Sequence, residues 1–231
     1  MKPGFQLLIL ATLCTTVLKA QKITFDREFY LGIGGGALSS SVDFVPAVQQ
    51  SFMTGLHGGL SAKYISENHL GLVAEINYAQ RGWTEAFDAG QDFSYSRTLN
   101  YLEIPFMTHI YFGNKFRFIV NVGPQISFLL NDDQQMNQAL ADDVAARKAA
   151  DPEAPIGVQY SPFDELNRVD YGIIGGMGLE LKTGIGDFDL EGRYYFGLGD
   201  VFNSRRSENA YFSRSAHRLI EAKLTYYIKI R

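Results

Sequence analysis

The chain has 231 residues, of which 46% are hydrophobic and only 20% are charged, and its formal net charge is -4. This length suits a single all-β domain, and the composition excludes charge-rich disorder and a helical membrane protein. The acidic balance argues against a nucleic-acid partner, which would require a basic face.

The first predicted element is a secretory signal peptide over residues 1–20. Lys2 precedes an apolar run from Phe5 to Leu18, and the small residue Ala20 ends the segment, which is the usual order in such a peptide. The run is short for a spanning helix, so a membrane anchor is the less favoured alternative. The single cysteine, Cys14, lies within this segment, and we therefore expect a mature chain without disulfides.

Residues 21–231 are predicted to form one outer-membrane β-barrel domain. Eight segments show period-two alternation, and the connections between them alternate between short and long. This layout predicts an all-β, eight-stranded antiparallel up-and-down transmembrane β-barrel with short periplasmic turns and long extracellular loops. The predicted strands are Phe29–Leu38, Thr54–Ile65, Leu70–Gln80, Thr98–Phe112, Phe116–Leu129, Tyr171–Leu181, Asp187–Leu198 and Arg218–Ile230.

The two faces of each predicted strand differ sharply in polarity. In the fifth strand, Phe118 and Val120 alternate with Arg117 and Asn121, and aromatic residues gather near the strand ends. A barrel in lipid requires one apolar face and places its charges on the other. We therefore expect the apolar face to point outward, with an exported soluble ligand-binding barrel, apolar inside, as the alternative.

An eight-stranded barrel has an interior just wide enough for side chains, so the sequence predicts a plugged lumen. Charges that face this interior should neutralise one another, because an unpaired buried charge costs several kcal/mol. A proton or ion path is the less favoured interpretation. The predicted lumen charge network consists of Lys63, Glu75, Glu103, Arg117, Glu180, Asp189, Glu191, Arg193, Glu221 and Lys223.

Two prolines lie in neighbouring predicted strands, where each removes a backbone donor. Folding the fourth and fifth strands about Asn114 places Pro105 opposite Gly123, and Pro124 opposite Ile104. We therefore expect a local bulge there. Glu103 and Gln125 should then face each other on the lumen side.

The longest loop is predicted to contain a helix from Asn131 to Ala150, capped by Asn131 or Asp132 and ended by Asp151 and Pro152. The last loop combines basic and aromatic residues that suit an anionic lipopolysaccharide or a protein partner. Solvation of the loop is the plainer role for them. This predicted loop interaction surface consists of Arg205, Arg206, Tyr211, Phe212, Arg214 and His217.

Four stretches of the chain resemble a known family. They are Tyr101-Leu102-Glu103-Ile104-Pro105-Phe106, Thr108-His109-Ile110-Tyr111-Phe112-Gly113, Asn121-Val122-Gly123-Pro124 and Leu190-Glu191-Gly192-Arg193-Tyr194-Tyr195. They resemble the outer-membrane β-barrel family of Bacteroidetes called PorT-like or porin-family proteins. The resemblance implies an eight-stranded outer-membrane barrel and, for PorT itself, an accessory role in type IX protein secretion.

The sequence thus predicts a small protein of the cell outer membrane that acts through its extracellular loops as a binding or assembly component. Expected partners are outer-membrane lipid, lipopolysaccharide and a secretion or envelope protein. A PorT-like secretion accessory, a soluble barrel and an outer-membrane enzyme remain alternatives. The enzyme alternative depends on His217 near Ser213 and Ser215, with Asp200 in the same loop, but their spacing requires no triad. We expect no enzyme activity, cofactor or metal, since the sequence shows neither a phosphate loop nor a metal-ligand cluster.

Overall fold

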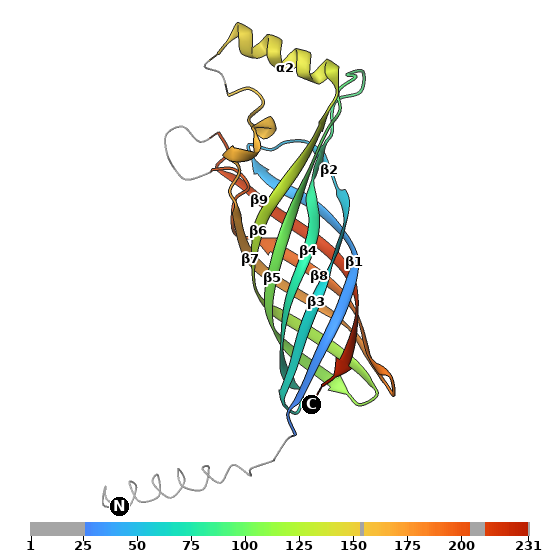
Figure 1. Cartoon of the computed structure of the whole chain (residues 1–231). Coiled ribbons are helices and arrows are strands. Elements are labelled where there is room, and N and C mark those ends of the chain that lie inside the picture. Colours follow the sequence, from blue (N-terminus) through green and yellow to red (C-terminus); the bar gives the residue numbers. More distant parts are fainter. Residues whose placement is uncertain (1–25, 153–154, 204–210, 231) are drawn as a thin grey trace, which may run out of the picture.

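A computed structural model describes residues 26–152, 155–203 and 211–230. These residues form eight long antiparallel strands that close into a tall barrel, and β2 (Gln50–Ser51) adds a short pairing to β4 (Figure 1). The predicted eight-stranded up-and-down fold is confirmed. The long strands are β1 (Glu28–Val45), β3 (Met53–Glu67), β4 (Leu70–Glu85), β5 (Tyr95–Gly113), β6 (Phe116–Met136), β7 (Val169–Thr183), β8 (Gly186–Gly197) and β9 (Arg214–Lys229).

The first and last long strands complete the ring. β1 pairs with β9 from Tyr30 opposite Lys229 to Val45 opposite Arg214. A closed ring has no sheet edge, so the strands satisfy one another's backbone N–H and C=O groups. The hydrocarbon region of a bilayer imposes this requirement on any structure that crosses it.

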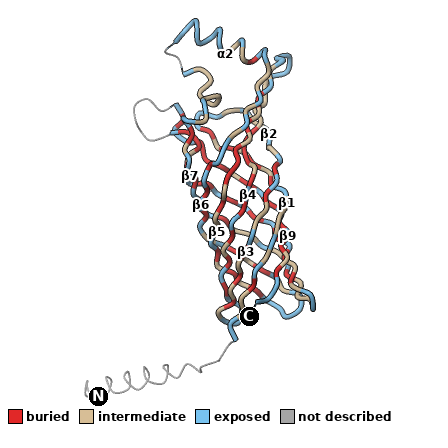
Figure 2. Tube along the Cα trace, viewed as in Figure 1, coloured by how far each residue is buried: buried red, intermediate tan, exposed pale blue. Residues whose placement is uncertain are grey.

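The apolar face of the barrel points outward and the charged face points inward, so buried and exposed residues alternate along the strands (Figure 2). Leu190 is 57% exposed, whereas Glu103 and Arg193 are only 1% and 3% exposed. A soluble ligand-binding barrel requires the opposite arrangement, so that alternative is wrong. Aromatic residues near both rims are exposed on the outer face, as predicted; they include Phe112, Phe116, Tyr78, Phe128, Tyr171 and Phe196.

Several strands extend further toward the long loops than predicted. β1 ends at Val45 rather than Leu38, and β6 ends at Met136 rather than Leu129. The start of β5 and the end of β6 rise above the rest of the ring, and β6 leads into the helix (Figure 1). Beyond the hydrocarbon, outward side chains need not be apolar, so the alternation fades although backbone pairing continues.

The register of β5 against β6 is displaced from the prediction. Pro105 lies opposite Gln125 instead of Gly123, and Ile104 lies opposite Ile126 instead of Pro124. The pairing follows from the turn that joins the two strands, where Gly113 lies opposite Arg117. A wrong centre for this turn displaced every predicted partner along the hairpin.

The predicted bulge at the prolines is also wrong. Glu103 lies opposite Ser127 rather than Gln125, and the register is the same on both sides of the prolines. The register shift of this strand pair lies nearer the loops, between Asn100 and Tyr101. The sheet therefore accommodates the missing donors without inserting a residue.

The loop helix α2 (Gln138–Ala150) is shorter than predicted. The segment from Asn131 to Met136 continues β6 and pairs with β5, so neither Asn131 nor Asp132 is the cap. Asn137 caps the helix, because its side-chain oxygen accepts a hydrogen bond from Leu140 N at 3.1 Å. Two short 3₁₀ turns, η1 (Val158–Tyr160) and η2 (Phe163–Glu165), follow. Among the described residues, no helix is long and apolar enough to cross a membrane.

Glycines on the inner face allow the strands to approach closely. A Cβ atom added to Gly36 would lie 1.8 Å from Ala222 O, and one added to Gly59 would lie 2.0 Å from Ile76 O. Neither position has room for a side chain. The strands therefore curve tightly there, which keeps the interior narrow.

Candidate functional site

The first group of inward-facing charges lies toward the short turns. Lys63 Nζ contacts the Glu180 carboxylate and lies 3.2 Å from Asp189 Oδ2. Arg117 Nη1 donates to Glu180 Oε1 at 2.8 Å. The Lys63 ammonium nitrogen lies over the Tyr227 ring, 4.0 Å from the ring centroid. These contacts join strands that are far apart in sequence.

The second group lies at mid-height. Arg193 donates from both terminal nitrogens to the Glu75 carboxylate at 2.9 Å and from Nη2 to Glu191 Oε2 at 2.5 Å. Lys223 Nζ donates to Glu75 Oε2 at 2.6 Å. All four side chains are buried. Ion pairs of this kind depend on every partner, since a single charge left behind is expensive to bury.

The third group lies nearest the loops and centres on Arg81, which was not predicted. Its Nη2 atom lies 2.8 Å from Glu103 Oε1, and Nη1 donates to Asp170 Oδ2 at 2.8 Å. The guanidinium stacks on the Tyr101 ring, and the Tyr195 hydroxyl donates to Asp170 at 3.0 Å. Arg81 lies an even number of residues after Glu75 in the same strand, so both side chains face the lumen. This alternation could have identified Arg81 from the sequence.

The structure places all the predicted lumen residues on the inner face and brings most of them into these three groups. Glu221 differs: among the described residues its ion-pair contact is with His57, whose Nδ1 lies 3.8 Å away. The members that do fall in the groups are Lys63, Glu75, Glu103, Arg117, Glu180, Asp189, Glu191, Arg193 and Lys223.

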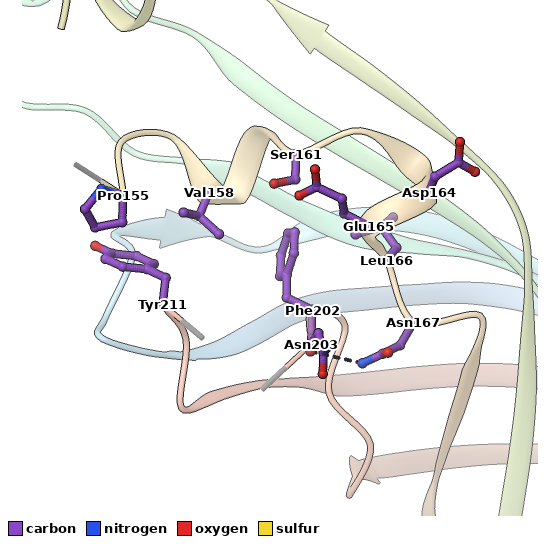
Figure 3. Close-up of a pocket in the computed structure, with 10 residues that line it drawn as sticks. All are labelled: Pro155, Val158, Ser161, Asp164, Glu165, Leu166, Asn167, Phe202, Asn203 and Tyr211. Carbon is purple, nitrogen blue, oxygen red and sulfur yellow. Dashed lines mark hydrogen bonds between the residues drawn. The ribbon is translucent and has the colours of Figure 1, made fainter. Parts of the chain in front are cut away.

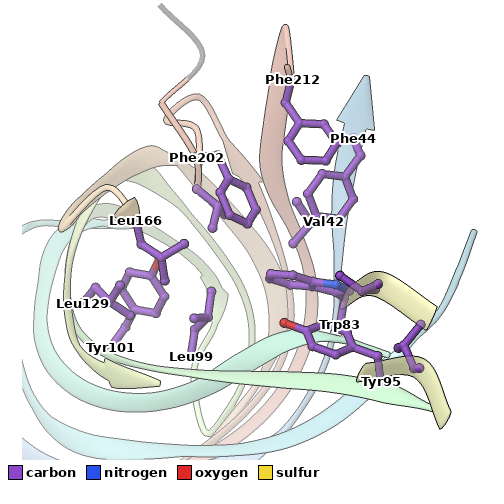
Figure 4. Close-up of a cluster of buried hydrophobic side chains, with 13 residues drawn as sticks. Val42, Phe44, Trp83, Tyr95, Leu99, Tyr101, Leu129, Leu166, Phe202 and Phe212 are labelled. Carbon is purple, nitrogen blue, oxygen red and sulfur yellow. The ribbon is translucent and has the colours of Figure 1, made fainter. Parts of the chain in front are cut away.

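Above the third group, buried apolar side chains form an aromatic cap over the barrel mouth (Figure 4). The Phe44 ring packs edge-on against Trp83 at 5.3 Å and lies 4.9 Å from Phe212. Strand ends and loops thus contribute to one apolar layer. The aromatic cap consists of Val42, Phe44, Trp83, Tyr95, Leu99, Tyr101, Leu129, Leu140, Val144, Leu166, Val201, Phe202 and Phe212.

Arg97 fastens the segment between α2 and β7 to this cap. The side chain is fully buried, and its Nη1 donates to Ser161 O at 2.9 Å and to Gln159 O at 3.4 Å. Its Nε donates to Asp132 Oδ2 at 2.9 Å. One guanidinium therefore holds the η1 backbone against two long strands.

Several pockets open among the described loop residues, and two of them border η1. The larger, of about 520 Å³, lies between the η1–η2 segment and the last loop (Figure 3). Within it, Asn167 Nδ2 donates to Phe202 O at 3.0 Å. Its lining residues are Pro155, Val158, Ser161, Asp164, Glu165, Leu166, Asn167, Phe202, Asn203 and Tyr211.

The second pocket, of about 370 Å³, is called the lateral pocket below. It lies between α2, the β4–β5 connection and η1. The Tyr160 hydroxyl donates to Glu85 Oε2 at 2.7 Å, and burial together with this contact raises the pKa of Tyr160. Its lining residues are Glu85, Phe87, Gln91, Phe93, Leu140, Asp143, Arg147, Gln159 and Tyr160.

The predicted loop interaction surface is only partly accessible. Tyr211 and Arg214 are exposed, and Arg214 forms an ion pair with Asp43 at 3.1 Å. Phe212 and His217 are buried, so neither contributes to an exposed surface. The reason is that Phe212 joins the aromatic cap and His217 belongs to the inner face of β9. Arg205 and Arg206 lie outside the described residues.

Among the described residues, His217 is not hydrogen-bonded to the serine or aspartate side chains on which the enzyme alternative depends. Ser215 Oγ accepts from Phe202 N at 3.0 Å, and Ser215 N donates to Asp200 Oδ1 at 2.6 Å. Neither ring nitrogen of His217 has a hydrogen-bond partner in the described part of the chain. Across the same residues, no group of three or more His, Cys, Asp or Glu side chains is arranged to hold a metal ion.

Comparisons with known proteins agree with this architecture. The family model described as "Outer membrane protein beta-barrel domain" matches residues 19–203. No curated protein matches the chain significantly.

Three solved structures illustrate the similarity. Neisserial surface protein A aligns with a TM-score of 0.48 and 12% identity, over 89% of this chain and 100% of that one. OprG from Pseudomonas aeruginosa aligns with a TM-score of 0.44 and 12% identity, over 87% of this chain and 96% of that one. Ail, the attachment invasion locus protein of Yersinia pestis, aligns with a TM-score of 0.41 and 10% identity, over 87% and 99% of the two chains.

Proposed function

Since this chain belongs to the outer membrane protein beta-barrel domain family and lies in the cell outer membrane, we propose that it is a sealed barrel that acts through its extracellular loops as a binding or assembly component. The barrel would then serve as a rigid support. The loops would present the surfaces that recognise a ligand or partner outside the cell.

The observation that carries this proposal is the filling of the lumen. Three groups of paired charges occupy successive heights, and the aromatic cap lies above them. A permeating ion would have to separate these pairs or displace buried rings, and both steps cost free energy. The long loops and the pockets among them are the proposed places for recognition.

Conductance across a planar lipid bilayer tests the sealed lumen. Purified barrel should produce no current steps above those of protein-free bilayers. A variant that replaces both Arg193 and Glu75 with Ala provides a comparison, since it removes two long side chains from mid-height. Regular current steps from the unaltered protein would contradict the proposal.

Lipopolysaccharide is the proposed neighbour of the loop-side rim. Arg214 and Arg218 lie on the outward face of β9 and both contact Asp43 Oδ2, at 3.1 and 3.0 Å. Two guanidinium groups beside one carboxylate leave one positive charge, which suits the anionic headgroups of the outer leaflet.

A PorT-like role in type IX secretion is the second candidate, and it rests on the resemblance of the Tyr101–Phe106 stretch. Tyr101 and Glu103 of that stretch face the lumen and contact Arg81. The resemblance at those two residues therefore concerns the interior of the barrel, which the family would share. A secretion partner would have to contact other residues. Loss of type IX cargo export in a deletion strain would support this candidate, and normal export would reject it.

Two further proposals concern processing and chemistry. We propose that residues 1–20, which lie outside the described residues, are a signal peptide; N-terminal sequencing of the mature protein should then begin at Gln21.

We also propose that the protein is not an enzyme. An activity on lipid or peptide that is lost in a His217→Gln variant would overturn the second proposal.

A further inference from the structure

We propose that the lateral pocket is a binding site for a neutral saccharide, and this inference rests on the proposed role of the loops in recognition. The pocket has a volume of about 370 Å³, which is within the range of about 300–1,000 Å³ usual for small-molecule sites. It lies on the loop side of the barrel and therefore outside the cell.

The aromatic walls of the pocket come from two separate segments. Phe87 and Phe93, on the β4–β5 connection, pack edge to face at 5.7 Å. Tyr160, on η1, packs against Tyr95 at 4.5 Å. Aromatic faces offer flat apolar surfaces, and the C–H face of a pyranose ring is a flat apolar surface of similar size.

The walls are held in place before any ligand arrives. Tyr160 is fixed by its hydrogen bond to Glu85, and the backbone on either side of it is held by the contacts of Arg97 with Gln159 O and Ser161 O. Leu140 anchors the α2 wall because it is buried in the aromatic cap. A preformed site loses less entropy on binding, which favours a weakly interacting ligand such as a sugar.

The polar lining carries planar groups that can pair with adjacent hydroxyls. Carboxylates are supplied by Glu85 and Asp143, and amides by Gln91 and Gln159. Each carboxylate oxygen can accept a second hydrogen bond, and each amide both donates and accepts. Two neighbouring hydroxyls on a sugar ring are spaced so that both can hydrogen-bond to one carboxylate or one amide group.

The charges of the lining select against ionic ligands. Arg147 is neutralised by Asp143, since their closest atoms are 2.6 Å apart. Both oxygens of Glu85 already accept hydrogen bonds, at 2.7 Å from Tyr160 and at 3.4 Å from Gln159. An anionic ligand would meet a net negative lining, and a cationic ligand would have to compete for a carboxylate already engaged. A neutral polyol avoids both costs.

The larger pocket supports a weaker argument. Its lining includes Asn203 and Tyr211, and residues 204–210 between them lie outside the described part of the chain. The lateral pocket is formed by described residues alone.

Calorimetric titration of the purified full barrel in lipid nanodiscs tests the proposal. The probes are glucose, galactose, mannose, N-acetylglucosamine, maltose, cellobiose and lactose, with glucuronate and glucosamine as charged comparators. At least one neutral sugar should bind with a stoichiometry of one per chain. Phe93→Ala should weaken that binding by about tenfold, as loss of one aromatic contact with its buried area implies. Phe52→Ala is the matched control: its ring is exposed between β2 and β3 and lines neither pocket, so binding should be unchanged.

Heat-modifiable gel migration confirms that each variant is folded before titration. If Phe93→Ala does not fold, Gln91→Ala replaces it and should also weaken binding, because Gln91 is exposed and supplies one of the amides that pair with sugar hydroxyls. Absence of binding by every neutral sugar would overturn the inference, as would equal effects of Phe93→Ala and Phe52→Ala. Tighter binding of glucuronate or glucosamine would overturn the choice of a neutral ligand. The conductance of the bilayer is independent of these results, so a sealed barrel without sugar binding rejects only this inference.

Discussion

The lumen and the aromatic cap block the same passage with different interactions. In the lumen, charged side chains from facing strands pair at distances such as 2.9 Å between Arg193 and Glu75. In the cap, apolar rings from strand ends and loops pack together, as Phe44 does with Trp83. The stability of the lumen therefore depends on the pairing of opposite charges, whereas the stability of the cap depends on how completely apolar side chains fill its volume.

This difference teaches how each region should respond to change. A buried charge left without its partner keeps its full desolvation cost, and rigid strands give it little room to move toward water. A lost ring leaves a cavity, whose cost depends on how far the neighbouring loops can close in. Substitutions in the lumen should therefore affect the whole barrel, and those in the cap should act more locally.

The largest effect is expected from Arg193→Met. The variant keeps an unbranched stem but removes the guanidinium, which leaves Glu191 without its cation and Glu75 with Lys223 and Asn77 as partners. Breaking a buried ion pair in this way should lower the free energy of unfolding by about 3–5 kcal/mol. Urea titration in lipid vesicles, followed by gel migration, measures the change.

Arg168→Met is the matched control for this variant. Arg168 forms an ion pair with Asp164 at 2.9 Å, but its side chain is 49% exposed. An exposed pair contributes about 0–1 kcal/mol, so the control should remain close to the unaltered protein. Similar losses in the two variants would mean that the lumen pairs are not specially important.

The next largest effect is expected from Trp83→Ala in the aromatic cap. Trp83 is fully buried between Phe44 and Phe202, whose ring centroids lie 5.3 and 6.1 Å away. The cavity should cost about 3 kcal/mol, because the cap borders water and its loops can partly close in. Limited proteolysis should cut the loops faster, while the barrel still migrates as folded protein.

Trp83→Phe is the control, because it retains a ring against Phe44 and should give a smaller loss. If Trp83→Ala instead destabilised the barrel as strongly as Arg193→Met and left the loops protected, the distinction between the two regions would fail.

The lumen could largely be predicted from the sequence because strand geometry fixes it. Alternation places every second residue inside, so Lys63, Glu75 and Arg193 were recognised without knowing their partners. Arg81 was missed because the predicted strand ended at Gln80. Beyond that point the outward residues are Gly82 and Thr84, which are not apolar enough to indicate a lipid-facing strand. Every second side chain nevertheless continues to face the lumen.

The cap and the loops could not be predicted in the same way, since no period relates their residues. Phe202 and Phe212, on either side of residues 204–210, both lie over the mouth and there meet Phe44. The interpretation of Phe212 as a surface residue failed for this reason. The interpretation of His217 failed because β9 begins at Arg214 rather than Arg218, which places His217 on the inner face of the strand. The partner pairs within the lumen also lay beyond the sequence, because they depend on which strands face each other across the ring.

A moderate effect is expected from Arg97→Lys, which tests the boundary between the two regions. Lysine keeps the charge beside Asp132 but cannot also reach Ser161 O and Gln159 O with separate nitrogens. Loss of hydrogen bonds from a charged donor should cost about 1.5–3 kcal/mol. Faster hydrogen exchange in η1 would locate the change.

Arg147→Lys is the control for Arg97→Lys, since the Arg147 side chain is 53% exposed and pairs with Asp143 within α2. We expect a change below about 0.5 kcal/mol there. Unchanged exchange in η1 after Arg97→Lys would show that other contacts hold this segment down.

The smallest effect is expected from Asn137→Ala. The Asn137 side chain accepts from Leu140 N at 3.1 Å and donates to Asp92 O at 2.7 Å, so it both caps α2 and ties it to the β4–β5 connection. Loss of a helix cap typically costs about 1 kcal/mol. Because α2 lies outside the closed ring, this cost should appear as faster amide exchange in its first turn, with no change in global unfolding. Asn137→Asp keeps the cap and loses the donor to Asp92, so it should preserve exchange protection in α2. Equal exchange in the two variants would show that burial of Leu140 and Val144, rather than the cap, holds the helix in place.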